Sequence, residues 1–210
     1  MKKTLVIGAT GLVGNQLIEL LLADGGYAVT ALVRKPVPIK HKQLTQLIFD
    51  FENPDQSMVL ADEVYCCLGT TIKVAGSKPA FYKVDFEYVL SIAQIAHGNG
   101  ASKFALVSSM GANKDSAIFY NKTKGAIEAA VTTIGYKSLF ILRPSVLLGD
   151  REEFRLSEKI GKTIMSVFAF AMPKKYRPIE ARQVAIAMIA CMSLDKSGVQ
   201  ILESDAIADL

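Results

Sequence analysis

The 210-residue sequence is poor in the residues that build metal sites and disulfides, with three cysteines and two histidines. Cys66 and Cys67 are adjacent within an apolar run and Cys191 stands far from both, so the spacing of zinc ligands is absent and we predict no metal. Core thiols of this kind are typical of a reducing compartment, and the predicted location is the cytoplasm. His41 lies among lysines and His97 in the last turn of a predicted helix, and neither is assigned a chemical role.

Long apolar runs and basic runs are also missing. No stretch of about 18 apolar residues occurs, so the sequence predicts no membrane span. The net charge is only +4, from 24 basic and 20 acidic residues, and no basic run alternates with aromatic residues, which argues against nucleic acid as a partner. Half of the residues are apolar and no repeats occur, so the length predicts one globular domain over residues 1–210.

Three glycines follow a short apolar run near the start of the chain, in the sequence Val-Ile-Gly-Ala-Thr-Gly-Leu-Val-Gly. A strand that enters such a turn and continues as a helix is typical of dinucleotide binding. Gly8 allows the tight turn, Gly11 lets the backbone approach a pyrophosphate, and Gly14 lets the helix pack closely on the strand. The unpaired N–H groups at the start of that helix favour an anion. The predicted cofactor contacts here are Gly8, Thr10, Gly11, Leu12, Val13 and Gly14.

Two basic residues, Arg34 and Lys35, end the next predicted strand. An acidic residue at this point would bind the adenosine ribose of NAD, whereas a basic residue meets the extra 2′-phosphate of NADP. We therefore predict NADP (NADPH) as the cofactor, the alternative being a solvated basic strand end. Asp50 and Phe51, at the end of the third predicted strand, are placed beside the adenine ring. Their alternative roles are a helix cap for Asp50 and a core position for Phe51.

Apolar strand-like runs alternate with helical segments along the chain, which predicts a doubly wound α/β domain with a parallel sheet and right-handed crossovers. Strands are expected at residues 4–7, 27–33, 44–51, 62–68, 103–107, 137–142 and 199–202. Helices are expected after Gly11 and at 78–97, 116–134 and 180–192, and a short polar tail ends the chain. Ligands of open parallel sheets bind beyond the carboxyl ends of the strands. The predicted cofactor site therefore includes Cys67, Leu68, Gly69 and Thr70.

Residues 151–178 differ in character from this alternating pattern. The segment is charged at first, then apolar, and finally basic at Lys174, Lys175 and Arg177. A substrate lid, an oligomer contact, a helix on a membrane surface and a plain core helix all fit such a sequence. Its position after the last cofactor-facing strand favours a lid or an interface within the single domain. The sequence leaves the oligomeric state open.

Tyr120 and Lys124 are four residues apart in a predicted helix, so they lie on one face, one turn apart. An exposed pair on a helix surface is the alternative. Together with the glycine turn, Ser109 and the run from Leu142 to Val146, this pattern resembles the short-chain dehydrogenase/reductase superfamily, over residues 1 to about 205. The sequences at 66–71 and 108–112 resemble its atypical group, which includes the Tat-interacting-protein oxidoreductases. The resemblance implies a Rossmann fold in a small single domain that binds NADP.

The resemblance also implies roles for three side chains. Tyr120 would pass a proton to or from the substrate carbonyl, and the ammonium of Lys124 would favour the ionised form of the tyrosine. Ser109 would hydrogen-bond the carbonyl oxygen as charge develops on it, with Ser108 as the alternative serine. The cofactor contacts that the resemblance adds are Tyr120, Lys124, Pro144 and Val146.

One position departs from the family pattern. Many members carry an asparagine after a valine in the preceding helix, whereas this chain has Val84-Asp85. The water relay that the asparagine holds in the family is therefore not carried over to this chain.

These observations predict a cytoplasmic NADPH-dependent oxidoreductase that transfers hydride to a small carbonyl or conjugated substrate. The first alternative is an NADPH-binding regulator or sensor with a protein partner and little or no catalysis. The second is a nucleotide-sugar epimerase or dehydratase, against which the short chain argues because such enzymes usually carry a larger substrate domain. No residue identifies the substrate.

Overall fold

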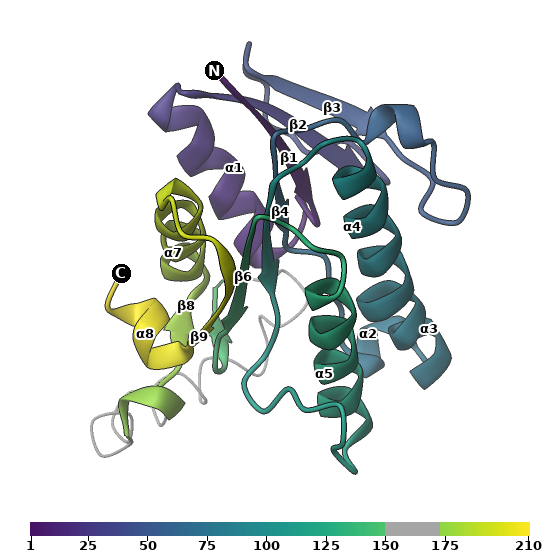
Figure 1. Ribbon diagram of the computed structural model, residues 1–210, viewed down its shortest axis with the longest axis vertical. Coiled ribbons are helices and arrows are strands. Elements are labelled where there is room, and N and C mark those ends of the chain that lie inside the picture. The colour runs from purple at the N-terminus through teal and green to yellow at the C-terminus, as the bar shows by residue number, and fades with distance from the viewer. Residues whose placement is uncertain (150–172) are drawn as a thin grey trace.

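The computed structural model describes residues 1–149 and 173–210, which form one seven-stranded sheet with the order β3-β2-β1-β4-β5-β6-β9. Neighbouring strands pair in parallel throughout, so their carboxyl ends lie at one edge (Figure 1). The chain runs outward from β1 to β3 and then crosses to β4 on the other side of β1, and such a reversal opens a crevice at that edge. The strands are β1 (Lys2–Ile7), β2 (Tyr27–Val33), β3 (Leu44–Ile48), β4 (Glu63–Cys66), β5 (Lys103–Val107), β6 (Ser138–Arg143) and β9 (Gly198–Glu203).

Helices cover both faces of the sheet (Figure 1). On one face α1 (Leu12–Asp24) packs against α7 (Ala181–Ser193), and α8 (Ser204–Ala208) lies beside α7. On the other face lie α4 (Val89–Gly98) and α5 (Phe119–Thr132). The short helix α2 (Ile72–Ala75) leads into α3 (Lys78–Tyr82), which continues through η2 (Lys83–Tyr88), a π-helical turn, into α4. In the described part of the chain, no helix has the length and apolar character needed to cross a membrane.

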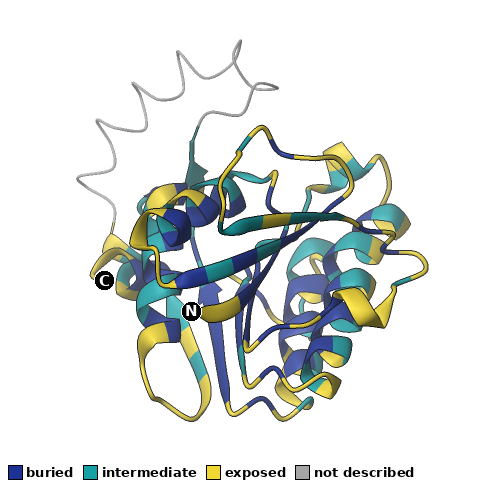
Figure 2. Cartoon of the chain, turned by 90° about the horizontal axis from the view of Figure 1, so that it is seen from above, coloured by how far each residue is buried: buried dark blue, intermediate teal, exposed yellow. Residues whose placement is uncertain are grey.

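The strands send alternate side chains into two cores. In β1, Val6 joins the core beneath α1 and α7, whereas Leu5 and Ile7 join the core beneath α4 and α5. All three side chains are fully buried, as is the centre of the sheet in Figure 2. A parallel sheet covered on both faces needs strands that are apolar on both sides, and this requirement explains the continuous apolar runs in the sequence.

The sheet confirms the predicted doubly wound parallel α/β fold, and β2 and β5 have the predicted bounds. The third and fourth predicted strands are too long. β3 ends at Ile48 because its partner β2 ends at Val33, and β4 ends at Cys66. The helix expected from residue 116 begins at Phe119. The predicted polar tail is wrong, because α8 forms there and buries Ile207 in the core beneath α7.

A separate two-stranded sheet pairs β7 (Leu147–Leu148) with β8 (Ile179–Glu180). The turn η4 (Lys174–Tyr176) precedes β8. Of the predicted lid or interface segment 151–178, residues 151–172 lie outside the described residues, so this prediction stays open. The two short strands were not predicted from the sequence, and they bring Leu148 and Glu180 next to each other.

Candidate cofactor cleft and active site

The turn between β1 and α1 is built around positions that exclude side chains. Gly8 has a φ of +80°, and a Cβ there would lie 2.4 Å from the backbone of Cys67. A Cβ on Gly14 would lie 2.2 Å from the carbonyl oxygen of Gly8, and one on Gly11 would lie 3.3 Å from the same oxygen. The Gly11 N–H donates to that oxygen at 3.0 Å. The loop therefore needs glycine at positions 8 and 14, and it leaves open the space in front of the first turn of α1.

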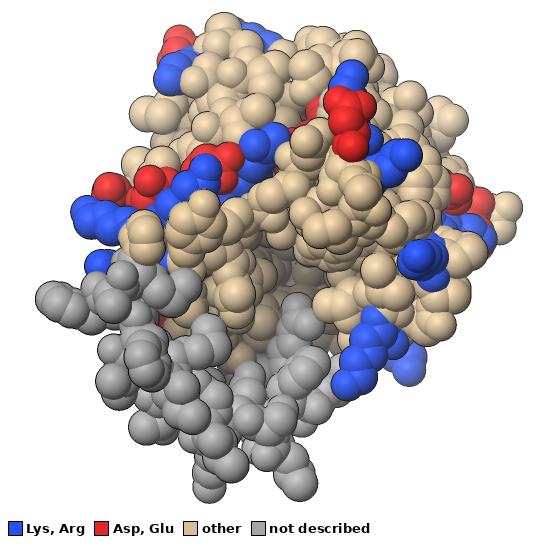
Figure 3. All heavy atoms as spheres, turned by 90° about the horizontal axis from the view of Figure 1, so that it is seen from below, with Lys and Arg blue, Asp and Glu red and all other residues tan. Residues whose placement is uncertain are grey.

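A cleft of about 1240 Å³ opens in front of this turn, at the carboxyl edge of the sheet. Figure 3 looks onto this edge and shows a hollow among mostly uncharged residues. The loops after β1 and β4 form one side of the cleft, and residues of α2, α3 and η2 contribute to its wall. The predicted cofactor residues that line it are Gly8, Thr10, Gly11, Leu12, Arg34, Cys67, Leu68, Gly69 and Thr70.

Other predicted cofactor residues do not line the cleft. Val13 and Gly14 are buried in α1, behind the turn. Phe51 is buried against Phe49 and Tyr88, and exposed Asp50 accepts hydrogen bonds from the Glu52 N–H and the Asn53 side chain. Thus Phe51 occupies a core position, and Asp50 stabilises a turn. The remaining predicted residues outside the lining are exposed Lys35, half-buried Tyr120, buried Lys124, buried Pro144 and exposed Val146.

Charged and aromatic side chains gather near Arg34 in the cleft. Glu52 accepts hydrogen bonds from Lys83, at 2.8 Å, and from the Tyr88 hydroxyl. Burial and this carboxylate raise the pKa of Tyr88 to about 12. The Arg34 guanidinium itself makes no hydrogen bond or ion pair among the described residues, so it is available to a ligand.

No sequence pattern signals this cluster, because Glu52, Lys83 and Tyr88 come from a loop and a helix that meet only in the folded chain. The same holds for the far side of the cleft, where the small β7–β8 sheet brings further residues to the wall. Those lining residues are Leu148, Gly149, Glu180, Ala181 and Arg182.

Tyr120 and Lys124 lie one turn apart near the start of α5. Lys124 is buried, and its Nζ lies 2.7 Å from Oδ1 of Asp85. The ring of Tyr120 packs on Phe81, with centroids 5.3 Å apart. Lys124 is therefore no solvated surface residue, and the interpretation of the Tyr-x-x-x-Lys pattern as an exposed pair is wrong for the lysine.

The Lys124–Asp85 pair borders the cleft at Gly69. A Cβ on Gly69 would lie 3.2 Å from Asp85 Oδ1 and 3.4 Å from Lys124 Nζ, and Gly69 lines the cleft. The other carboxylate oxygen, Oδ2, accepts the Thr70 N–H at 2.8 Å. Asp85 thus links the lysine on α5 to the loop after β4.

The charges around Lys124 decide its protonation. Burial by itself would lower the pKa of the Lys124 ammonium, but the Asp85 carboxylate and smaller effects of Tyr120 and Cys66 together outweigh burial, and the pKa lies above its usual value. The nearby Cys66 thiol is neutral at pH 7, because burial raises its pKa to about 12. Burial also raises the pKa of the Asp85 carboxyl, whereas the Lys124 ammonium and the Thr70 N–H lower it in part.

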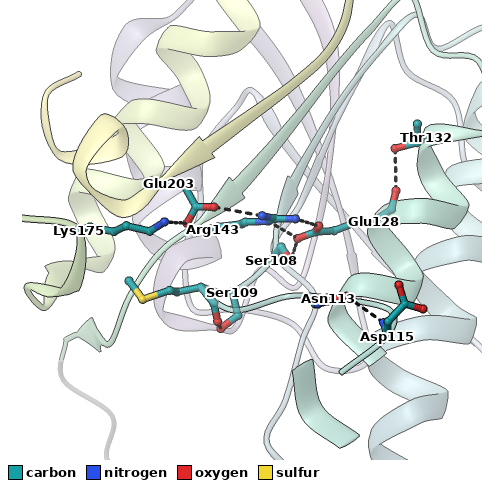
Figure 4. A network of polar contacts seen from close by, with 10 residues as sticks. Ser108, Ser109, Asn113, Asp115, Glu128, Thr132, Arg143, Lys175 and Glu203 are labelled. Atoms are coloured by element: carbon teal, nitrogen blue, oxygen red, sulfur yellow. Dashed lines mark hydrogen bonds and ion pairs between the residues drawn. The ribbon is translucent and has the colours of Figure 1, made fainter. Parts of the chain in front are cut away.

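The two candidate serines have different surroundings (Figure 4). Ser108 is buried, and its hydroxyl donates to the Glu128 carboxylate. Glu128 also binds Arg143 at 2.6 Å, and Arg143 reaches Glu203 at 3.1 Å. Ser109 is half-buried and donates only a long hydrogen bond of 3.3 Å, to the Met110 carbonyl. Ser108 is thus occupied in a structural network, and Ser109 is the serine with a hydroxyl that can turn to a ligand.

No metal site accompanies these residues. Within residues 1–149 and 173–210, no group of three or more His, Cys, Asp or Glu side chains is arranged to hold a metal ion. The three cysteines are free thiols. Cys66 and Cys191 are buried and Cys67 is half-buried at the cleft, where its carbonyl faces Gly8.

Comparisons with known proteins agree with a nucleotide-binding cleft. The family described as NAD(P)H-binding matches residues 8–192. The protein HTATIP2 of Rattus norvegicus is 32% identical over 217 residues, which cover 100% of this chain and 89% of the relative. The protein FMP52, mitochondrial, of Candida albicans is 35% identical over 172 residues, which cover 77% of this chain and 74% of the relative.

Two solved structures show a similar fold. MoeE5 in complex with UDP-glucose and NAD has a TM-score of 0.73 at 16% identity, covering 96% of this chain and 76% of that chain. The UDP-N-acetylglucosamine 4-epimerase from Methanobrevibacter ruminantium M1 has a TM-score of 0.74, also at 16% identity, with the same coverage of both chains. At this level of identity the likeness shows the fold alone.

Proposed function

Because the chain belongs to the NAD(P)H-binding family, we propose that it is an NADPH-dependent oxidoreductase that reduces a small carbonyl or conjugated substrate. The observation that carries the proposal is the position of Lys124, whose buried Nζ lies next to Gly69 of the cleft lining, one helical turn from Tyr120. A tyrosine and a lysine at the carboxyl edge of a dinucleotide-binding sheet form a proton-transfer site next to a hydride donor.

The cleft fits the cofactor at two points. Gly8 and Gly11 place no side chains of their own in front of the first turn of α1, where a pyrophosphate gains from free N–H groups. Arg34 offers an available guanidinium for a 2′-phosphate. The pyrophosphate site fits either cofactor, and the guanidinium supports NADPH over NADH. When bound, the nicotinamide supplies hydride.

The protein's own groups handle the proton and the oxygen. Tyr120 donates its hydroxyl proton to the substrate oxygen, and the Ser109 hydroxyl hydrogen-bonds that oxygen as negative charge develops. Lys124, as an ammonium, favours the tyrosinate that remains. The half-buried positions of Tyr120 and Ser109 support these roles, because both side chains are in part accessible at the carboxyl edge.

The test is a reduction assay with Tyr120→Phe, which removes one hydroxyl. Purified protein is incubated with NADPH and a panel of aldehydes, ketones and conjugated carbonyls. We expect turnover with the wild type and a loss of about 10²- to 10⁴-fold in the variant, with unchanged NADPH affinity. Tyr82→Phe, at a half-buried tyrosine that does not line the cleft, is the matched control and should retain full activity. The proposal fails if the wild type reduces nothing while a control reductase reduces the same panel.

A second candidate function is an NADPH sensor with little catalysis. The observation that favours it is the Asp85 carboxylate, which offsets the charge of Lys124 and weakens its pull on Tyr120. A sensor would bind NADPH, change its affinity for a protein partner, and keep both properties in Tyr120→Phe. Nucleotide-sugar chemistry rests on fold likeness alone, and copurified, non-exchanging NAD would be its signature.

The proposed location is the cytoplasm. The three free thiols support a reducing compartment, although the FMP52 relatives carry the word mitochondrial in their names. Cell fractionation of a tagged full chain decides between the two compartments, and recovery with mitochondria would overturn the proposal.

A further inference from the structure

Asp85 connects helix α5 to the loop after β4. Its side chain is fully buried, with Oδ1 2.7 Å from Lys124 Nζ on α5 and Oδ2 2.8 Å from the backbone nitrogen of Thr70. Both carboxylate oxygens are thus occupied by donors that belong to the candidate site. No other residue of η2 is buried.

The backbone that carries Asp85 is a π-helical turn between two α-helical segments. A π turn contains an extra residue compared with an α turn, is rare, and occurs frequently at functional sites. In η2 the acidic residue Asp85 is turned inward while Glu87 is exposed. The irregular turn therefore places one acid, and not its neighbour, against the lysine.

Burying this ion pair costs free energy of desolvation. The side chains of Lys124 and Asp85 are 7% and 0% exposed. Burial removes both charges from water, and a buried pair often stabilises a fold less than apolar side chains of the same volume. An arrangement that includes two buried charges, a π turn and a backbone hydrogen bond thus needs a reason other than stability.

We propose that Asp85 is the positioning residue of Lys124, holding Nζ next to Gly69 of the cleft lining and keeping the amine protonated. An ammonium has three N–H donors. One donor faces Asp85, which leaves two for Tyr120 or for hydroxyl groups of a bound ligand. A neutral asparagine at position 85 could accept a hydrogen bond, but it would provide no charge to hold the proton on a buried lysine.

The groups that face Lys124 come from three elements. They are Asp85 from η2, Tyr120 from α5 itself and Cys66 from β4. Of these, Asp85 is the one that forms an ion pair with the ammonium, at 2.7 Å. The protonation of Lys124 should therefore depend on Asp85 above all.

The experiment measures the protonation of Lys124 directly, in the protein without cofactor. Lysine side chains are labelled with ¹³C at Cε, and the Lys124 signal is identified by its loss in Lys124→Met. In the wild type we expect this signal to titrate above the normal range of lysine. In Asp85→Asn we expect the titration to move down by at least about one pH unit, because burial is then unopposed. Glu87→Gln makes the same chemical change at an exposed position of η2 and should leave the titration unchanged.

An unchanged Lys124 titration in Asp85→Asn overturns the proposal, as does an equal shift in Glu87→Gln. Should Asp85→Asn fail to fold, Lys124→Met is titrated through the labelled carboxyl carbon of Asp85. The proposal expects the carboxyl to titrate at higher pH in Lys124→Met than in the wild type, and an unchanged value overturns it.

The catalytic use of Lys124 rests on the proposed function. NADPH titration distinguishes a failure of that function from a failure of the positioning role of Asp85. If the wild type binds no NADPH but Lys124 titrates as expected, the proposed function fails and the pairing stands. If the wild type reduces carbonyls and its activity has the same pH profile in Asp85→Asn, the positioning role fails and the function stands.

Discussion

A Cβ atom placed on Gly14 would lie 2.2 Å from the carbonyl oxygen of Gly8. Both partners in this contact are backbone, so neither can move without opening the turn between β1 and α1. We expect Gly14→Ala to lower the free energy of unfolding by about 3 kcal/mol, the upper end for overpacked sites. Urea unfolding measures this. Gly98→Ala is the control, because a Cβ there meets nothing within 4 Å; equal losses in the two variants would contradict the steric argument.

Arg34 lines the cleft, whereas its neighbour Lys35 does not. Removing a charged hydrogen-bond donor to a phosphate costs about 1.5 to 3 kcal/mol, so Arg34→Ala should weaken NADPH binding by about 10- to 100-fold and leave NADH binding almost unchanged. Lys35→Ala should have a smaller effect on both cofactors. Fluorescence titration with each cofactor checks the prediction. Equal affinity for NADPH and NADH, insensitive to Arg34→Ala, would exclude the NADP assignment.

Ser108 and Ser109 should respond to mutation in different ways. Ser108→Ala leaves the Glu128 carboxylate without one of its donors, so it should lower stability by about 1 to 3 kcal/mol and change turnover little. Ser109→Ala should keep stability and lower turnover by about 10²-fold. Thermal unfolding and steady-state kinetics on the same preparations separate the two effects, and a reversed pattern would assign the catalytic role to Ser108.

The Lys124–Asp85 pair should make stability sensitive to alkaline pH. The pKa of Lys124 is raised in the folded chain above its usual value of 10.5, so the folded state holds the proton more tightly than the unfolded state. The pair's contribution is then complete below about pH 10.5 and is lost as the pH rises through the folded pKa. The difference in unfolding free energy between the wild type and Lys124→Met should therefore shrink at alkaline pH. A difference that stays constant up to pH 12 would show that the pair does not titrate.

Much of the fold could be predicted because its signals are local. Apolar runs bounded by turn residues identified the strands, and the bounds at Tyr27–Val33 were correct. Errors occurred where a partner decides the end of an element, as at Ile48, which pairs with the last residue of β2. The π turn could not be predicted, because the residues of η2 are also compatible with a continuous α-helix. Its position depends on the contact of Asp85 with a lysine on another helix.

Some parts of the candidate site could be predicted from the sequence and others could not. The glycine turn and Arg34 follow from short spacings, and the fold and family resemblance are confirmed by the comparisons. Sequence spacing cannot distinguish a buried lysine from an exposed one. The ion pair of Lys124 with Asp85 could therefore be found only in the structure. The roles of Ser109, Tyr120 and Lys124 stay predictions until the variants are measured.

The small sheet of β7 and β8 separates two tasks within the chain. Because Leu147 pairs with Ile179 and Leu148 with Glu180, the chain leaves and rejoins the cleft wall at neighbouring points. This pairing brings Glu180 and Arg182 to the same cleft as Leu148 and Gly149. The small sheet thus builds one wall, while the glycine turn and Arg34 belong to the large sheet and its loops.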